Sequence, residues 1–297
     1  MAYVSRICIR SKICIKLIFR TLNSSNDYVR ITVSYVLAYL QLSSIPNLKV
    51  TILADNDYYS QTSSPTYAHL SSLPRFNNLH IPIHQANKTG LGSSAALITS
   101  LTASLLLFLS DIDIQTDKRI IHNLAQAAHC AAQGKVGSGF DVASAVYGSC
   151  IYQRFMPEVL EGVLLDSQFY ESEFRKQLRG VVGREWAMDV RPFEMTSALR
   201  VVMGDVSAGS ATPSMVRSVL KWKAGGEGAT AVWEKLGSSN RRLIENFDQL
   251  KEFESADIIE ELRLGLRRPR DSSRPQIHEA LEDISRQFEV NSVPVQF

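Results

Sequence analysis

Two glycines followed by two serines form the strongest chemical pattern in this sequence. Residues 88–96 read Lys-Thr-Gly-Leu-Gly-Ser-Ser-Ala-Ala. Gly90 and Gly92 allow the backbone to turn tightly and to approach a ligand closely. Ser93 then opens a predicted helix, whose unpaired N–H groups and positive dipole end attract an anion. The pattern therefore predicts a phosphate site.

The polar side chains of this segment could take part in that site. Ser93 and Ser94 offer hydroxyls for a phosphate oxygen or for Mg²⁺, and Lys88 adds a positive charge. A helix that is simply capped by serine would use the same residues, so that interpretation stays open. The chain contains neither a Walker loop nor a Gly-x-Gly-x-x-Gly dinucleotide motif.

A second glycine-rich segment ends in a carboxylate. Gly134, Gly137 and Gly139 precede Asp141, which starts another predicted helix. Such a loop suits close contact with a ligand, and Asp141 could orient or deprotonate a hydroxyl nucleophile. An aspartate at this position could equally be only the N-cap of the helix, and both interpretations stay open.

A third segment combines a strand end with hydroxyl side chains. Gly204-Asp205 is followed by Ser207, Ser210 and Thr212, before a predicted helix at 213–222. Anion binding is one interpretation of this segment, and a plain capping loop is the other.

Strands and helices must position these segments. In the first half we expect strands at 49–54, 79–84 and 149–155. We also expect four helices. One starts at Ser25 or Asn26 and ends before Pro46, and the others are a helix at 95–109, a helix capped by Asp117 and a short helix at 141–147. In the second half, 186–195 and 198–205 are predicted as paired strands. Helices are expected from Pro213 to Phe288, with breaks at Gly225-Gly226 and Arg268-Pro269. The pattern is α+β, with strands concentrated before about residue 205.

The first 26 residues carry basic side chains and no acidic one before Asp27. An organelle transit peptide and a basic edge strand both fit that charge. Because Ile7, Ile9, Ile13 and Ile15 follow a period of two, the strand is favoured.

The overall composition limits the partners. The 32 Lys and Arg against 30 Asp and Glu leave a formal net charge of +2, so no nucleic acid or anionic membrane is expected as the main partner. The 4 cysteines form no Cys-x-x-Cys pair, which fits a reducing compartment. The apolar run at 95–109 is too short to cross a bilayer. We expect a cytoplasmic protein, and the sequence leaves its oligomeric state open.

Taken in order, these segments resemble those of the GHMP kinases, and most closely those of the fungal phosphomevalonate kinases in that family. The matching stretches are residues 88–95, 122–126, 128–130, 133–142 and 147–149. The resemblance implies an α+β, two-lobed fold, with an N-terminal lobe like ribosomal protein S5 domain 2 and a ferredoxin-like C-terminal lobe, both incomplete. It divides the chain into an atypical basic stretch at 1–26, an N-terminal domain at 27–156 and a C-terminal domain at 157–297.

The resemblance also implies a reaction, in which the γ-phosphoryl group of ATP passes with Mg²⁺ to 5-phosphomevalonate in the mevalonate route to sterols. Asp141 and Lys88 would be catalytic, and Ser94 would also bind Mg²⁺. The residues that would hold the ATP phosphates are Gly90, Leu91, Gly92, Ser93, Ser94 and Ala95. Those expected near the acceptor are Ser138, Gly139, Ser210 and Thr212. Mevalonate kinase is the enzymatic alternative, but its metal-binding Glu corresponds here to about His129, which favours the phosphomevalonate branch.

The chain departs from the family at both ends. An N-terminal Pro-Gly-Lys segment and a late Gly-rich loop are absent, and Gly225-Gly226-Glu227-Gly228 comes too early, so it is interpreted as a linker. Without the corresponding strands we expect an exposed sheet edge and an incomplete C-terminal sheet. A truncated, non-catalytic relative or a partial gene model is therefore the second hypothesis.

Overall fold

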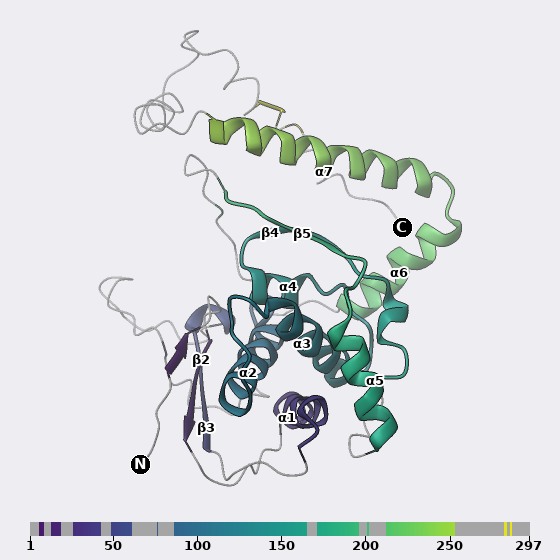
Figure 1. Cartoon of the computed structure of the whole chain (residues 1–297). Coiled ribbons are helices and arrows are strands. Elements are labelled where there is room, and N and C mark those ends of the chain that lie inside the picture. Colours follow the sequence, from purple (N-terminus) through teal and green to yellow (C-terminus); the bar gives the residue numbers. More distant parts are fainter. Residues whose placement is uncertain are drawn as a thin grey trace. The chain divides into compact units, whose positions relative to one another are not determined.

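Strands at the start of the chain form an antiparallel sheet. The structure is a computed structural model that describes residues 6–8, 13–18, 26–42, 49–60, 76, 86–164, 171–195, 201, 212–252, 282, 283 and 286. Strands β1 (Arg6–Cys8), β2 (Ile13–Ile18) and β3 (Lys49–Ala54) lie in the order β1-β2-β3, with Ile15 opposite Ile52 (Figure 1). The strand interpretation of the basic stretch is confirmed, because the residues that alternate with a period of two form the paired strands β1 and β2.

Three helices pack against one another beside this sheet. They are α1 (Asp27–Leu40), α2 (Ser93–Leu109) and α3 (Lys118–Gln133), and α2 also contacts β2 (Figure 1). Helix α2 is apolar on nearly every side, and Ile98, Leu101 and Leu106 in it are fully buried. The predicted assignment of this run to a buried helix is confirmed.

The predicted helix starts are correct in position, but only one is capped as expected. The Asn26 side chain accepts a hydrogen bond from the N–H of Tyr28, which begins α1. Asp117 stands at the start of α3, but its carboxylate instead accepts from the N–H of Asp113. The acid therefore orders the preceding turn rather than the helix.

Shorter elements complete the part of the chain before residue 193. They are η1 (Asn56–Tyr58), α4 (Phe140–Tyr147), β4 (Cys150–Gln153), η4 (Pro157–Leu160), α5 (Ser172–Gly183) and β5 (Asp189–Pro192). Strand β5 pairs with β4, so that Tyr152 faces Val190 in the register. The predicted partner of this strand, 198–205, lies outside the described residues except Val201. Helix α4 contacts α2, α3 and both strands.

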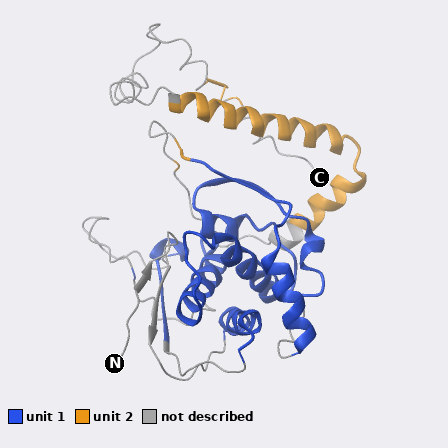
Figure 2. Cartoon of the chain, viewed as in Figure 1, with its two compact units in different colours: residues 1–193, 205–209 blue, residues 194–204, 210–297 orange. Residues whose placement is uncertain are grey.

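The chain divides into two compact units, shown in Figure 2. Residues 1–193 with 205–209 form the first, and residues 194–204 with 210–297 form the second. The second contains α6 (Thr212–Gly225) and α7 (Ala229–Glu252), so the predicted break at Gly225-Gly226 is confirmed. None of the helices in the described ranges has both the length and the apolar composition for a membrane crossing. The domain limits at residues 26 and 156 stay a prediction.

Candidate active site

Two left-handed glycines shape the start of α2. Gly90 has φ +81° and Gly92, the N-cap residue, has φ +74°, a region that favours glycine. Gly92 has no side chain to cap the helix, and Ser93 is already the first helical residue. Serine capping is therefore the wrong interpretation of this segment. The first-turn N–H groups keep their capacity to bind an anion.

The residues before this turn are held against η1. Lys88 forms an isolated antiparallel bridge with Tyr59, and the Thr89 hydroxyl donates to the carbonyl of Asp57 over 2.6 Å. The Lys88 side chain is exposed, and its ammonium group lies 5.7 Å from the centroid of the Tyr28 ring. Backbone pairing with Tyr59 thus fixes the position of Lys88, and its charge lies beside Tyr28 of α1. The strand predicted at 79–84 lies outside the described residues.

The second glycine-rich segment repeats this arrangement. Gly139, with φ +84°, is the N-cap of α4, so Asp141 is the second helical residue and not the cap. The capping interpretation of Asp141 is therefore wrong. Its Oδ1 accepts from the N–H of Val142 over 3.0 Å, which orients the carboxylate. Ser94 and Asp141 hence hold equivalent places, each two residues after a left-handed glycine.

Gly139 is also needed for space. A β-carbon there would lie 2.7 Å from the hydroxyl of Tyr152, 2.9 Å from Oε1 of Gln126 and 3.0 Å from Cε1 of Phe155. The Tyr152 hydroxyl donates to the carbonyl of Ser138 over 3.2 Å. The turn that delivers Asp141 is therefore fixed by close packing.

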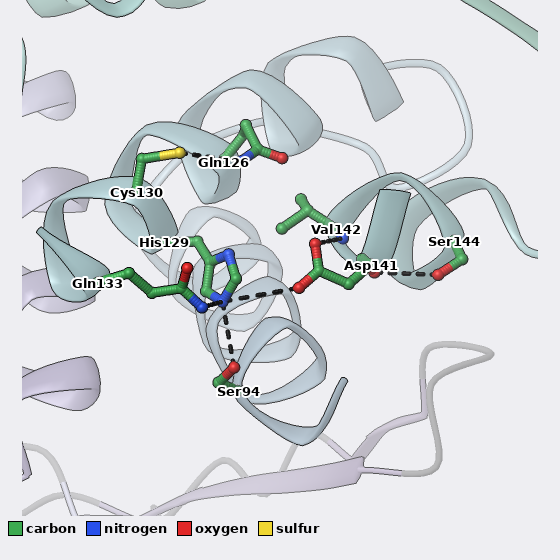
Figure 3. A network of polar contacts seen from close by, with 8 residues as sticks. All are labelled: Ser94, Gln126, His129, Cys130, Gln133, Asp141, Val142 and Ser144. Carbon is green, nitrogen blue, oxygen red and sulfur yellow. Dashed lines mark hydrogen bonds and ion pairs between the residues drawn. The ribbon is translucent and has the colours of Figure 1, made fainter. Parts of the chain in front are cut away.

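His129 of α3 lies between the two helix starts, as Figure 3 shows. Its Nε2 atom lies 3.1 Å from Oγ of Ser94, 3.1 Å from Nε2 of Gln133 and 3.9 Å from Oδ2 of Asp141. Burial lowers the pKa of His129; the Asp141 charge opposes this, and the charges of Lys135 and Lys88 add to it.

The structure thus brings some of the predicted residues together and leaves others unplaced. Ser94 and Asp141 meet through His129, and a β-carbon on Gly92 would lie only 3.3 Å from Cβ of Asp141. Ser210 lies outside the described residues, and Thr212 begins α6 in the other unit. In the sequence, His129 stands out only as the counterpart of a glutamate in mevalonate kinase, and Gln133 is not assigned a functional role. Their spacing of four residues on one helix face is the signal that was available.

The residues present fit a magnesium ion. The hydroxyl of Ser94 and the carboxylate of Asp141 are hard oxygen donors of the kind that Mg²⁺ prefers. Within the ranges that the structure describes, no group of three or more His, Cys, Asp or Glu side chains could hold a metal alone. An ion here would need further oxygens from water or from a phosphate, as is usual for Mg²⁺.

Comparisons with known proteins point in the same direction. Residues 68–149 match the family model of the GHMP kinases N terminal domain. Over 229 residues the chain is 43% identical to a phosphomevalonate kinase of Aspergillus fumigatus, covering 73% of this chain and 47% of that protein. Over 236 residues it is 45% identical to one from Gibberella zeae, covering 74% and 52%. The chain thus spans about half the length of these relatives.

A solved structure shares the fold. It is phosphomevalonate kinase from Streptococcus pneumoniae in complex with phosphomevalonate and AMPPNP. The match to it has a TM-score of 0.54 and a sequence identity of 14%, and it covers 93% of this chain and 70% of that chain. The expected α+β, GHMP-kinase-like fold is confirmed by this likeness and by the family match. The resemblance to fungal phosphomevalonate kinases is confirmed by the identities over about three quarters of the chain.

Proposed function

We propose that this chain supplies the phosphoryl-transfer site of a phosphomevalonate kinase. In the reaction, an oxygen of the acceptor phosphate bonds to the γ-phosphorus of ATP as the bond to the β–γ bridging oxygen breaks. The products are 5-diphosphomevalonate and ADP. The observation that carries this proposal is the meeting of Ser94 and Asp141, each at the glycine-turned start of a helix, on the two sides of His129.

The start of α2 is proposed to hold the nucleotide. The residues would be Gly90, Leu91, Gly92, Ser93, Ser94 and Ala95, whose backbone N–H groups can face the phosphates. Mg²⁺, bound through Ser94, would neutralise charge on the phosphate oxygens. Lys88 would add a second positive charge from the strand-like segment before the turn. Positioning and charge neutralisation of this kind account for most of the catalysis in phosphoryl transfer.

The start of α4 is proposed to face the acceptor. Oδ1 of Asp141 is engaged by the N–H of Val142, so Oδ2 is the oxygen that would orient the acceptor or take its remaining proton. Ser138 and Gly139 would lie near the acceptor's phosphate. Ser210 and Thr212, from the segment that follows Gly204-Asp205, are proposed to lie there as well. The S. pneumoniae protein binds phosphomevalonate, which supports this choice of acceptor.

The proposed setting is the mevalonate pathway that leads to ergosterol, which fits the fungal relatives. We infer a cytoplasmic location, for which the free thiols of Cys130 and Cys150 are consistent evidence. The relative in Arabidopsis thaliana is named as peroxisomal, so the peroxisome is the compartment to compare. Imaging of a tagged chain beside a peroxisomal marker would test the location.

The function is tested by ADP release from the purified chain with ATP and Mg²⁺. We expect ADP with 5-phosphomevalonate and little with mevalonate, and the doubly phosphorylated product should appear at the same rate. Equal or faster turnover of mevalonate would favour mevalonate kinase. A folded chain that releases no ADP with either acceptor would contradict the proposal for this chain.

A further inference from the structure

We propose that Arg154 binds the phosphate group of the acceptor, and that its guanidinium group makes the chain prefer 5-phosphomevalonate to mevalonate. This inference rests on the proposed function and deepens it, because it names the cation of the acceptor site. The residues proposed to lie near the acceptor's phosphate are two serines, a glycine and a threonine, none of which carries a charge. A phosphate monoester carries a charge of about −1.5 to −2 at neutral pH, and Asp141 adds a further negative charge beside it, so the site needs a cation.

The end of β4 brings Arg154 to the glycine-rich loop that precedes Asp141. Side chains two positions apart in an extended segment point to the same side, and both Tyr152 and Arg154 reach this loop. The Tyr152 hydroxyl donates to the carbonyl of Ser138 over 3.2 Å, and Nη2 of Arg154 lies 3.5 Å from the carbonyl oxygen of Val136. The guanidinium group is therefore held beside the turn that carries Ser138.

This contact leaves most of the guanidinium group available to a ligand. An arginine has five N–H donors, and a distance of 3.5 Å is long for a hydrogen bond. The Arg154 side chain is exposed, and no carboxylate among the residues that the structure describes pairs with it. Its Cζ atom lies 5.9 Å from the ring centroid of the buried Phe155, so a cation–π contact steadies the side chain.

The charges of Arg154 and Asp141 act on the same two groups. Burial raises the pKa of the Cys130 thiol, and it raises the pKa of the Tyr152 phenol to about 12. In both groups the negative charge of Asp141 adds to the increase, and the positive charge of Arg154 opposes it. An anion bound between Ser138 and Asp141 would therefore lie within reach of the Arg154 charge.

The shape of the arginine side chain gives the preference for a phosphate. The planar guanidinium group can donate two parallel hydrogen bonds to two phosphate oxygens. The exposed hydroxyl of Ser138 can add a third bond from the same loop. Mevalonate has only a hydroxyl group where 5-phosphomevalonate has its phosphate, so it gains none of the bidentate contact. Arg154 would thus distinguish the two acceptors.

The experiment measures the dissociation constants of 5-phosphomevalonate, mevalonate and ADP by calorimetry. Arg154→Met removes the charge, and Arg154→Lys keeps the charge but loses the planar fork. Arg184→Met is the matched control, because Arg184 is also exposed and donates to a backbone carbonyl, that of Val159, over 3.0 Å.

We expect Arg154→Met to weaken the binding of 5-phosphomevalonate about 10- to 100-fold, the loss of a charge-assisted hydrogen bond. The affinities for mevalonate and ADP should stay within about twofold of the wild type. Arg154→Lys should bind 5-phosphomevalonate with an affinity between those of the wild type and Arg154→Met. Arg184→Met should match the wild type with all three ligands.

A purely structural role of Arg154 would give a different pattern. If the side chain only held the loop through Val136, Arg154→Met would weaken the binding of both acceptors equally, and that result would overturn the inference. An unchanged affinity for 5-phosphomevalonate would overturn it as well. Should Arg154→Met not fold, NMR of the wild type decides, with the Nε–H signal of Arg154 identified by its loss in Arg154→Lys. We expect this signal to shift with 5-phosphomevalonate and not with mevalonate, and a signal that neither acceptor moves would overturn the inference.

Failure of the inference can be told from failure of the proposed function. A wild type that binds 5-phosphomevalonate with the expected Arg154 dependence, but releases no ADP in the presence of ATP, would contradict the function alone. Normal turnover with an affinity for 5-phosphomevalonate that ignores Arg154 would contradict the inference alone. A wild type that binds no 5-phosphomevalonate would overturn both.

Discussion

A β-carbon on Gly92 would lie 3.3 Å from Cβ of Asp141, so the N-cap of α2 is in contact with the start of α4. This contact sets the distance between the proposed phosphate-binding turn and the proposed acceptor-orienting carboxylate. A glycine at this position satisfies two requirements, because its φ of +74° is left-handed and its missing side chain makes room for Asp141.

Gly92→Ala should therefore impair both turnover and stability. The left-handed φ should cost roughly 1–2 kcal/mol, and the added methyl should displace Asp141 by a few tenths of an ångström. A misplacement of about 1 Å at a reacting centre can cost about 10²-fold in rate, so a shift of a few tenths of an ångström should slow turnover several-fold. Steady-state ADP release and urea unfolding would measure the two effects.

Gly228→Ala is the matched control. Gly228 has φ +72° with no heavy atom within 4 Å of an added β-carbon, and it lies in the linker between α6 and α7. We expect a similar loss in the free energy of unfolding and no loss of turnover. Equal losses of turnover in both variants would show that the Gly92 contact is unimportant.

Asp141→Asn and Ser94→Ala should each abolish measurable phosphoryl transfer, a loss of about 10²-fold or more, while the fold persists. The asparagine can retain the bond to the Val142 N–H, so only the charge of Asp141 is lost. Two control variants make the same chemical changes elsewhere. Asp189→Asn removes a charge from an exposed ion pair, and Ser110→Ala removes a hydroxyl at the C-terminal end of α2. Wild-type rates in either site variant would refute the role of that residue.

Gly139→Ala should destabilise the protein strongly, and Tyr152→Phe should partly restore it. The added methyl would lie 2.7 Å from the Tyr152 hydroxyl, an overlap that the second substitution removes. Tyr152→Phe alone should cost about 1 kcal/mol, because the bond to the Ser138 carbonyl is lost. A double-mutant cycle of unfolding free energies should therefore be non-additive. Simple additivity would mean that the turn relaxes elsewhere.

Acid should weaken the fold through His122. Burial lowers the pKa of this side chain to about 4, although its bond to Asn123 opposes the shift. Unfolded chains take up the proton near pH 6.5 and the folded chain does not, so stability is present above that pH and falls as pH drops toward 4. The total effect of this group is about 3 kcal/mol.

The measurement is urea unfolding at intervals between pH 7.5 and pH 5. His122→Gln cannot titrate but can still donate to Asn123, so it should lessen the loss of stability at low pH. Part of the loss should remain, because the pKa of His129 is lowered as well. An unchanged pH dependence in the variant would show that His122 has the same pKa in the folded chain as in the unfolded chain.

Local patterns in the sequence sufficed for the elements and for part of the site. The alternation in the basic stretch, the apolar face of α1 and the Gly-Ser run at the start of α2 each depend on neighbours a few residues apart. Backbone sterics and the burial of one face decide such features, so they can be predicted without knowing what lies opposite. The proposed phosphate turn at Gly90 and Gly92 was found in this way.

Tertiary packing decided the rest. Ser94 and His129 are 35 positions apart, and nothing local to either indicates their contact. The pairing of β4 with β5 joins segments on either side of α5, and the place of Asp141 after its glycine cap depends on close packing by Tyr152 and Gln126. Sequence alone determined which groups could do chemistry. Only the fold determined which of them meet, because the packing of α2, α3 and α4 sets these distances.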